Sequence, residues 1–292
     1  MTDSNSYWRQ YTVTFPVAIP GSLYENNTAY GDYYQTLRAG KAPLAILVHG
    51  WGDHSTIPMR MLARGLARKG IHAFVLYLPF HSRRLPPEMK ERAPNFTPEE
   101  WFTGYRVAVT DVRKILDWAQ IVTEIDASRI ALVGLSLGAF VGAIAMGIDE
   151  RINAGVFIVS GGNSSKIQQF SRFSAFRRRY RVSAAEYEEY QVKYKQYLEE
   201  IAVQGWENVT PSRQYFLIDP LTYAGRLKGR RLLMINALWD ELIPRVAARD
   251  FQRACAPCET MWLPASHTTI WLLYPLVASR IERFLRTVFH AG

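Results

Sequence analysis

The sequence predicts an α/β protein with a mostly parallel, doubly wound sheet and one inserted helical segment. From Lys41 onward the candidate strands are continuous apolar runs, which are typical of strands buried on both faces of a parallel sheet. Segments with helical patterning lie between these runs, and such alternation of strand and helix indicates a doubly wound sheet. Residues 161–230 break the alternation and are themselves helical in pattern.

The composition is that of a packed, soluble protein. Of the 292 residues, 48% are apolar and only 2 are cysteines, which excludes a disordered, collagen-like or disulfide-stapled chain. The length fits one large α/β domain that carries an insertion. The N-terminal segment has no basic start and no apolar run, so we expect no secretory signal and a cytoplasmic location.

Two uncharged stretches of 19 residues, 130–148 and 261–279, are long enough to cross a membrane. The first begins as a β-type run, turns at glycine and only then becomes helix-like, while the second contains Pro264 and Pro275. We therefore expect a strand, a turn and a helix in the first stretch, and a strand, a loop and a helix in the second. No stable membrane insertion is predicted.

The strands begin with an antiparallel pair. Between Tyr11 and Ile19 apolar residues occupy every second position, a period that indicates a strand with one buried face. A turn-rich stretch then leads to a second strand near residues 32–37. The apolar runs that predict the parallel strands are 44–48, 71–78, 130–133, 156–159, 232–235 and 261–263.

Helices are predicted between these runs. Thr97 can cap a helix whose first residue is Pro98, and Glu100 can complete a capping box, so a helix starts there and continues to about residue 122. Further helices are predicted at 57–69, 139–147, 244–254 and 271–289.

Residues 161–230 are predicted to form a helical cap inserted into an α/β core made of residues 1–160 and 231–292. Their length far exceeds the usual connection in such folds. Five tyrosines in the segment recur at spacings of seven, three, four and three, which stacks them on one helix face. We expect this stripe to pack between cap and body, and any part that faces a pocket favours apolar acyl or aromatic groups. The five are Tyr180, Tyr187, Tyr190, Tyr194 and Tyr197.

The insertion is also basic. Its 12 Lys and Arg outnumber its 7 Asp and Glu, so it contributes +5 of the net +9, and Arg177, Arg178, Arg179 and Arg181 are closely grouped. Such a group occurs on faces that bind nucleic acid or an anionic membrane. Because no recognised nucleic-acid module accompanies it, we expect a solvated cap surface and no nucleic-acid partner.

The sequence Gly134-Leu135-Ser136-Leu137-Gly138 carries the strongest chemical signal, with a predicted strand before it and a helix after it. A strand that turns at once into a helix with serine at the tip needs glycine on either side, because a larger side chain collides with the strained turn. The turn lifts the Ser136 hydroxyl out of the sheet and leaves the Leu137 amide at a helix N-terminus. Ser136 is therefore the candidate nucleophile, and the Leu137 amide is a candidate oxyanion donor.

With this motif in this setting, the chain resembles the α/β-hydrolase superfamily, in particular its serine esterase, dienelactone-hydrolase-like and acyl-peptidase-like branches, from about Lys41 to the C-terminus. In that family the acid and then the histidine follow the nucleophile along the chain. Asp240 lies just past the strand that follows the insertion, where the family places its acid, and Glu241 is an adjacent alternative. His267 follows the last predicted strand, and the resemblance implies that it is the general base for Ser136.

The segment His49-Gly50-Trp51-Gly52-Asp53-His54 follows the strand predicted at 44–48. In the resembled family this loop offers the second oxyanion donor, which here is the backbone amide of Trp51. The competing interpretation is a metal site of His49, Asp53 and His54. It is weaker because adjacent loop residues rarely project to one point and no distant carboxylate pattern supports it. We expect neither a metal nor an organic cofactor.

Two further segments contain reactive side chains. His81 and Arg83 follow the strand predicted at 71–78, at the rim where ligands bind in open α/β folds, and they either contact substrate or stabilise the loop. Cys255 and Cys258 have redox spacing but no second pair for zinc, so we expect two ordinary thiols or an incidental local disulfide.

The resemblance and these residues together imply a serine carboxylesterase that hydrolyses a small-molecule ester, with an apolar acyl or aromatic group, through an acyl-enzyme on Ser136. The same machinery serves a thioesterase, an amidase or peptidase, and an acyltransferase, and these alternatives stay open. The fold also hosts binding proteins whose triad is idle. No oligomeric state is predicted.

Overall fold

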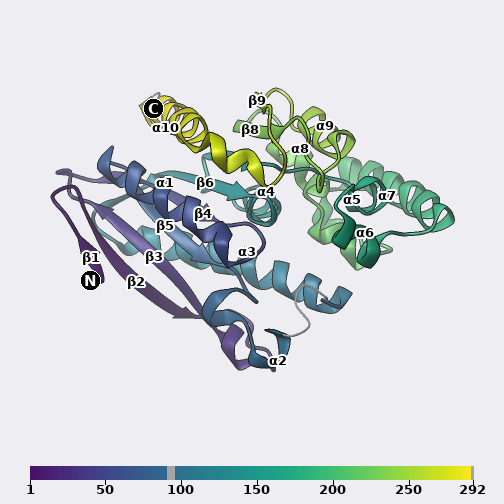
Figure 1. Ribbon diagram of the computed structural model, residues 1–292, viewed down its shortest axis with the longest axis horizontal. Helices are drawn as coiled ribbons and strands as arrows, with labels where there is room; N and C mark the ends of the chain where they lie inside the picture. The colour runs from purple at the N-terminus through teal and green to yellow at the C-terminus, as the bar shows by residue number, and fades with distance from the viewer. Residues whose placement is uncertain (91–95, 291–292) are drawn as a thin grey trace.

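The computed structural model describes residues 1–90 and 96–290, and in this part of the chain nine strands form one sheet with helices on both faces (Figure 1). The strands are β1 (Asp3–Ser4), β2 (Trp8–Pro16), β3 (Thr28–Thr36), β4 (Ala42–Val48), β5 (His72–Tyr77), β6 (Ile125–Leu135), β7 (Ala154–Ile158), β8 (Arg231–Ala237) and β9 (Glu259–Leu263). Across the sheet they follow the order β1-β2-β3-β5-β4-β6-β7-β8-β9.

The helices alternate with the parallel strands. The α-helices are α1 (Thr56–Arg68), α2 (Pro87–Lys90), α3 (Pro98–Ile121), α4 (Leu137–Ile148), α5 (Ser164–Phe170), α6 (Ser174–Tyr180), α7 (Ala184–Gln204), α8 (Ala224–Leu227), α9 (Arg245–Ala254) and α10 (Tyr274–His290). Short 3-10 helices are η1 (Tyr24–Asn27), η2 (Asp53–Ser55), η3 (Ser82–Arg84), η4 (Trp206–Asn208), η5 (Gln214–Ile218), η6 (Pro220–Tyr223) and η7 (Thr269–Leu273).

The sheet is antiparallel at its N-terminal edge and parallel elsewhere. The strands β1, β2, β3 and β5 pair antiparallel in that order, and the remaining neighbours from β5 to β9 pair parallel. This confirms the predicted mostly parallel, doubly wound sheet. The second strand starts earlier than residue 32, where the sequence predicted it, because the register pairs Pro16 with Thr28 and so extends β3 along all of β2.

The order of strands reverses at β4. The chain passes from β4 outward to β5 and then returns to place β6 on the other side of β4, where Val48 pairs with Gly134. In open α/β sheets ligands bind outside the carboxyl ends of the strands at such a reversal. The loops that follow β4 and β6 therefore lie next to each other at the edge of the sheet where a site is expected.

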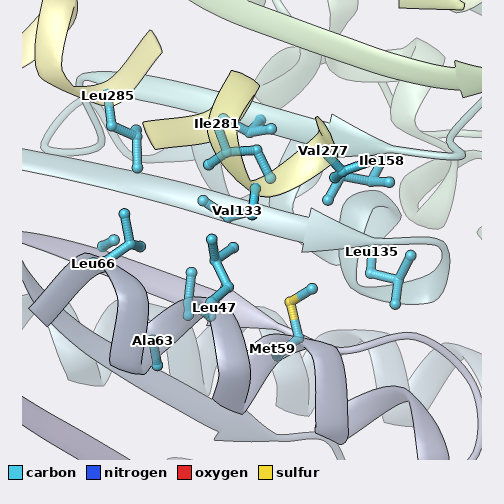
Figure 2. Packing of buried hydrophobic residues seen from close by; sticks show 14 of the residues in the cluster. Leu47, Met59, Ala63, Leu66, Val133, Leu135, Ile158, Val277, Ile281 and Leu285 are labelled. Atoms are coloured by element: carbon cyan, nitrogen blue, oxygen red, sulfur yellow. The ribbon is translucent and has the colours of Figure 1, made fainter. Parts of the chain in front are cut away.

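The helices α1 and α10 cover one face of the sheet. In α1 the buried residues Met59, Leu62, Ala63 and Leu66 recur at helical spacing and form one apolar stripe. They pack against strand residues such as Leu47 in a cluster that also receives buried side chains of α10 (Figure 2).

The helices α3, α4, α8 and α9 contribute to the cluster on the opposite face. The capping box predicted for α3 is confirmed, since the Glu100 N–H donates to Thr97 Oγ1 at 3.2 Å and the Thr97 N–H donates to Glu100 Oε2 at 2.8 Å. Helix α4 is buried over almost its whole length, which explains why its sequence is apolar all round.

Residues 161–230 lie between β7 and β8 and contain α5, α6, α7 and α8; we call this segment the insertion. The expectation that all five tyrosines share one helix face is wrong for Tyr180, which ends α6. A new helix, α7, begins after Ser183 because Ser183 and Glu186 form a capping box. Division into a core and a cap stays a prediction.

Three of the tyrosines form the centre of a small apolar cluster within the insertion. Tyr190, Tyr194 and Tyr197 surround Phe216, which is 0% exposed, with ring centroids 4.7–5.3 Å apart. The hydroxyl of Tyr194 also lies 3.0 Å from Thr222 Oγ1. These three tyrosines therefore pack the insertion against itself, whereas the sequence suggested that the whole stripe packs between the insertion and the sheet.

The two long uncharged stretches are divided as predicted. The first contains the end of β6, a turn and α4, and the second contains the end of β9, a loop, η7 and the start of α10. The helix predicted at 271–289 starts as η7 and becomes α-helical at Tyr274, so Pro275 lies in its first turn, where proline is tolerated. Within residues 1–90 and 96–290, no helix combines the length and the apolar character needed to cross a membrane.

Candidate active site

Ser136 occupies a strained turn between β6 and α4. Its backbone has φ 48° and ψ −114°, a left-handed conformation that is costly for a residue with a Cβ. Hydrogen bonds hold the turn on both sides: the Ser136 N–H donates to the Ile158 carbonyl at 2.8 Å, and the Ser136 carbonyl accepts the Ala139 N–H at 2.9 Å. The turn is thus fixed by the neighbouring strand and by the first turn of α4.

The glycines on either side of Ser136 are required by close backbone contacts. A Cβ at Gly134 would lie 2.3 Å from the carbonyl oxygen of Gly138, and a Cβ at Gly138 would lie 2.1 Å from that of Val48. Neither oxygen can move without shifting the main chain. The sequence predicted this need for glycine, and the contacts identify the partners as α4 for Gly134 and β4 for Gly138.

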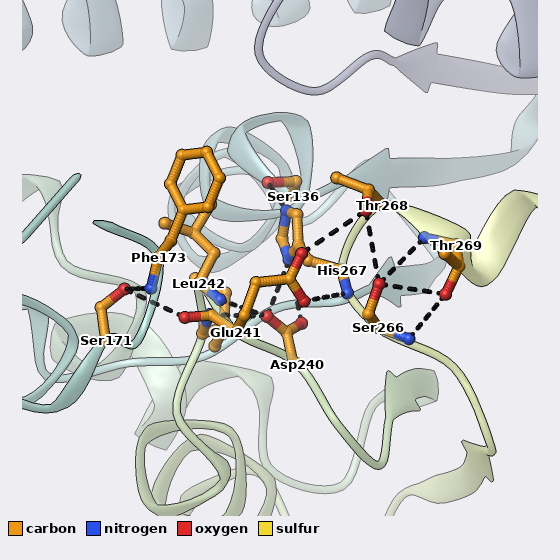
Figure 3. Close-up of polar contacts among 11 residues, drawn as sticks. Ser136, Ser171, Phe173, Asp240, Glu241, Leu242, Ser266, His267, Thr268 and Thr269 are labelled. Carbon is orange, nitrogen blue, oxygen red and sulfur yellow. Dashed lines mark hydrogen bonds and ion pairs between the residues drawn. The ribbon is translucent and has the colours of Figure 1, made fainter. Parts of the chain in front are cut away.

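Three side chains from distant parts of the chain meet at the carboxyl edge of the sheet (Figure 3). Ser136 Oγ lies 2.9 Å from Nε2 of His267, and Nδ1 of His267 lies 2.9 Å and 3.0 Å from the two carboxylate oxygens of Asp240. The side chains of His267 and Asp240 are 12% and 6% exposed, and Ser136 is 8% exposed. A neutral imidazole with its proton on Nδ1 can donate to Asp240 and accept from the Ser136 hydroxyl.

The loops that carry Asp240 and His267 are joined by backbone hydrogen bonds. The Leu238 N–H donates to the Leu263 carbonyl at 2.8 Å and the Trp239 N–H donates to the Ala265 carbonyl at 3.0 Å, which continues the pairing of β8 and β9. These two hydrogen bonds bring Asp240 and His267 together, although the two residues lie 27 positions apart.

The Asp240 carboxylate is fixed by its own turn. Its Oδ1 accepts the Leu242 N–H at 2.9 Å and the Ile243 N–H at 2.7 Å, so the turn sets the direction of the side chain. Glu241, the alternative acid, instead accepts the backbone N–H of His267 at 2.9 Å. Asp240 is therefore the carboxylate in contact with the imidazole, whereas the contact that Glu241 makes was not predictable from the sequence pattern.

Trp51 and Leu137 lie on the two loops that meet at the reversal of strand order. Leu137 is the first residue of α4, so its N–H has no acceptor within the helix. Trp51 follows β4 closely, and a Cβ on its neighbour Gly50 would lie only 3.2 Å from Cβ of Ser136. The assignment of these two amides as oxyanion donors stays a prediction.

His49 maintains the shape of the loop after β4. Its Nε2 accepts the Leu78 N–H at 3.0 Å, so Nδ1 carries the proton and donates to the Gly50 carbonyl at 2.7 Å. Burial lowers the pKa of His49 to about 3, which keeps the ring neutral. The neighbouring Ser55 hydroxyl lies 2.7 Å from the same Gly50 carbonyl. His49 thus has a structural role that the sequence alone did not indicate.

The metal alternative for this loop involved His49, Asp53 and His54. The side chain of Asp53 lies outside the described part of the structure. Among the described residues, no group of three or more His, Cys, Asp and Glu side chains is arranged to hold a metal ion.

A narrow apolar pocket of about 290 Å³, part of it open to solvent, has in its lining Leu137, the residue directly after Ser136. Trp51 and Leu137 line it, and further walls come from the loop after β5 and from α3. The rings of Trp51 and Trp101 lie 5.2 Å apart, and Trp101 Nε1 donates to the Tyr180 hydroxyl of α6 at 3.2 Å. The insertion therefore reaches the wall of this pocket through Tyr180.

The other reactive side chains singled out from the sequence differ in position. His81 is buried in the pocket wall and its Nδ1 lies 2.9 Å from the Pro79 carbonyl, whereas Arg83 is exposed. Cys255 and Cys258 are free thiols, and burial raises the pKa of both. The four grouped arginines of the insertion all lie at the surface, and they are Arg177, Arg178, Arg179 and Arg181.

The fold and this arrangement of serine, histidine and carboxylate define a class of α/β proteins whose chemistry lies at the carboxyl edge of the sheet. The model of the alpha/beta hydrolase family matches residues 45–280, and the chain belongs to this family. The resemblance inferred from the sequence is thereby confirmed. No match was found among curated proteins.

Several solved structures share the fold. One is a cold-adapted esterase from an Arctic intertidal metagenomic library, with 14% identity, a TM-score of 0.63 and 96% of each chain covered. Another is a hypothetical protein from Pseudomonas aeruginosa, with 14% identity, a TM-score of 0.63, and coverage of 97% of this chain and 94% of the other. A third is an acylaminoacyl peptidase from Pyrococcus horikoshii, with 15% identity, a TM-score of 0.62, and coverage of 96% of this chain and 42% of the other.

Proposed function

We propose that the protein is a serine carboxylesterase in which Ser136, His267 and Asp240 form the catalytic triad. The observation that carries the proposal is the unbroken series of contacts from Ser136 Oγ through the imidazole to Asp240, with distances of 2.9 Å on each side of the ring. A nucleophile, a base and an orienting acid in this order favour an acyl-transfer enzyme over a binding protein with an idle triad.

In the proposed reaction Ser136 Oγ attacks the carbonyl carbon of an ester, and its proton passes to Nε2 of His267. The oxyanion of the tetrahedral intermediate accepts hydrogen bonds from the amides of Trp51 and Leu137. The bond to the leaving oxygen then breaks, and His267 protonates that oxygen, which releases the alcohol and leaves an acyl group on Ser136. A water molecule attacks the acyl carbon as His267 takes its proton. That proton returns to Ser136 Oγ when the acid is released.

The pocket beside Ser136 supports a small-molecule ester whose acyl or leaving group is apolar or aromatic. Aromatic rings from Trp51, Phe80 and Trp101 line it, so an apolar group gains both burial and edge-to-face contact there. The narrowness of the pocket favours a short acyl chain or a single ring. In this proposal the insertion acts as a cap, because Tyr180 of α6 contacts the pocket wall at Trp101.

The test is a panel of p-nitrophenyl esters of increasing acyl length, assayed with the wild type, Ser136→Ala and Ser128→Ala. Loss of a serine nucleophile lowers kcat by about a millionfold in comparable triads. The matched control Ser128→Ala removes an exposed hydroxyl that bonds only within its own turn, to Asp126, and we expect wild-type rates. Equal turnover by Ser136→Ala and the wild type, or none by either, would refute the proposal.

The same panel separates the related activities. A thioester and an anilide of the preferred acyl group test the thioesterase and the amidase or peptidase alternatives, because leaving-group chemistry alone differs. Adding a competing alcohol and analysing the products detects acyl transfer. Asp240→Asn should lower kcat by about 10⁴-fold, since the imidazole then adopts the wrong tautomer. Full activity in that variant would assign the acid role to another carboxylate.

A further inference from the structure

Glu241 connects the loop of the base to the turn of the acid. It directly follows Asp240, and its Oε2 accepts the backbone N–H of His267 at 2.9 Å (Figure 3). Its Oε1 lies 3.4 Å from the hydroxyl of Thr268. The carboxylate therefore holds the main chain of the residue whose imidazole contacts Ser136, and it does so without touching the imidazole itself.

The main chain of Glu241 also holds part of the insertion. Its carbonyl oxygen accepts the N–H groups of Arg172 and Phe173, both at 2.8 Å, and the hydroxyl of Ser171 at 3.1 Å. These three donors form the linker between α5 and α6. Three donors to one carbonyl tie this linker to the main chain of Glu241, so a displacement of the linker strains or breaks these hydrogen bonds.

The linker is continuous with the part of the insertion that reaches the pocket. Helix α6 begins at Ser174 directly after it and ends at Tyr180, whose hydroxyl accepts from Trp101 Nε1. Trp101 lines the pocket beside Ser136. Contacts thus run without a break from the pocket wall through α6 and the linker to Glu241.

We propose that Glu241 is a positioning residue that couples the placement of the insertion to the alignment of His267, an inference that rests on the proposed function. In this proposal a substrate group in the pocket contacts Trp101. That contact stabilises the position of α6 in which the linker is hydrogen-bonded to Glu241, and Glu241 to the backbone of His267. Misplacing a reacting group by about 1 Å costs about 100-fold in rate, so even a loose link to His267 is detectable.

The first test compares Glu241→Ala with Glu241→Gln on a short p-nitrophenyl ester. Glu241→Ala removes the acceptor of the His267 N–H, and we expect kcat to fall by about 10- to 100-fold with little change in KM. Glu241→Gln keeps a carbonyl oxygen at the same place and should recover most of the rate. The matched control is Glu189→Ala, which removes an exposed carboxylate paired with Lys193 and Arg213 on the insertion and should leave kcat unchanged.

Coupling through Glu241 is tested by a double-mutant cycle with Ser171→Ala, which removes one donor to the Glu241 carbonyl. We expect Ser171→Ala to lower kcat several-fold in the wild type and to have no further effect when Glu241 is already alanine. Effects that multiply independently would overturn the coupling. A Glu241→Ala protein with wild-type kcat and only a lower Tm would overturn the positioning role.

Hydrogen exchange at the amides of residues 266–269 gives a readout that needs no turnover. Exchange should be faster in Glu241→Ala than in the wild type, intermediate in Ser171→Ala and normal in Glu241→Gln. Unchanged exchange in Glu241→Ala refutes the link to His267 even if the wild type is an active esterase. An inactive wild type in which exchange responds as expected instead refutes the esterase and retains the link.

Discussion

Replacing Gly138 by alanine tests whether the Ser136 turn depends on the close approach of α4 to β4. A Cβ at this position would lie 2.1 Å from the Val48 carbonyl oxygen and 2.5 Å from that of His49. Since real Cβ contacts begin near 3.0 Å, the main chain must shift by at least about 0.9 Å, the difference between 3.0 Å and 2.1 Å. Overpacking of this kind typically costs about 1–3 kcal/mol of stability.

The shift falls on the start of α4, which carries Ser136 and the Leu137 amide. Under the proposed function, a displacement of about 1 Å there lowers kcat/KM by about 100-fold, because the proposed nucleophile and the proposed oxyanion donor move relative to the imidazole. The assay is kcat/KM on the preferred p-nitrophenyl ester together with urea unfolding.

The matched control is Gly225→Ala in α8, where a Cβ meets no atom within 4 Å. It should keep wild-type kcat/KM and gain about 0.4–1 kcal/mol of stability. If Gly138→Ala had the wild-type kcat/KM and the wild-type free energy of unfolding, the argument from backbone contact would be wrong.

Three further predictions concern stability. Arg84 and Asp111 form an ion pair whose side chains are both 0% exposed, so Arg84→Met should lower the free energy of unfolding in urea by about 3–5 kcal/mol; a loss below about 1 kcal/mol would contradict a buried charge pair. Burial lowers the pKa of His49 from 6.5 to about 3, so the unfolded chain binds the additional proton and stability falls as the pH drops from about 6.5 toward 3. His49→Gln should reduce the slope of the unfolding free energy against pH by up to about 1.4 kcal/mol per pH unit. The same slope in the variant and the wild type would exclude the assigned role of His49. Phe216→Ala should lower the free energy of unfolding by about 3–5 kcal/mol, and limited proteolysis should then cleave residues 161–230 first. Cleavage spread evenly over the chain would argue against a separate cluster there.

The parts of the fold that were predictable from the sequence depend on local pattern. All seven residues of β4 are buried, and a run that is apolar on both faces is what a central parallel strand requires. The capping box of α3 was readable because its two hydrogen bonds join residues only three positions apart. In both cases the information lies within one segment.

The candidate site was predictable for a different reason. Parallel strands end at the same edge of the sheet, so residues that directly follow β6, β8 and β9 are brought together by topology alone. That argument selected His267 from six histidines and placed Asp240 near it. Position favoured Asp240 over the adjacent Glu241, but the sequence pattern does not specify the directions in which these two side chains leave the turn.

The contacts that the sequence did not reveal all join segments with no shared periodicity. Arg84 pairs with Asp111 across 27 positions, whereas the position at the rim of the sheet indicates His81 and Arg83 instead. The tyrosine stripe was recognised as helical, but its partner Phe216 lies in a 3-10 helix whose pattern carries no signal. Side-chain packing between irregular segments could therefore be identified only from the structure.

Main-chain contacts and side-chain contacts divide the candidate site into two parts that tolerate substitution differently. Ser136 and Asp240 are held by backbone hydrogen bonds and by glycine contacts with the sheet, so substitutions there disturb the main chain itself. The pocket wall instead consists of side chains such as Trp101, which contacts Tyr180 of the insertion through a hydrogen bond and an edge-to-face ring contact. Under the proposed function, the chemistry therefore depends on the main chain of the fold, whereas selectivity depends on side chains that can be exchanged without repacking the sheet. Glu241 is the residue where the two parts meet, because its main chain anchors the insertion and its carboxylate holds His267.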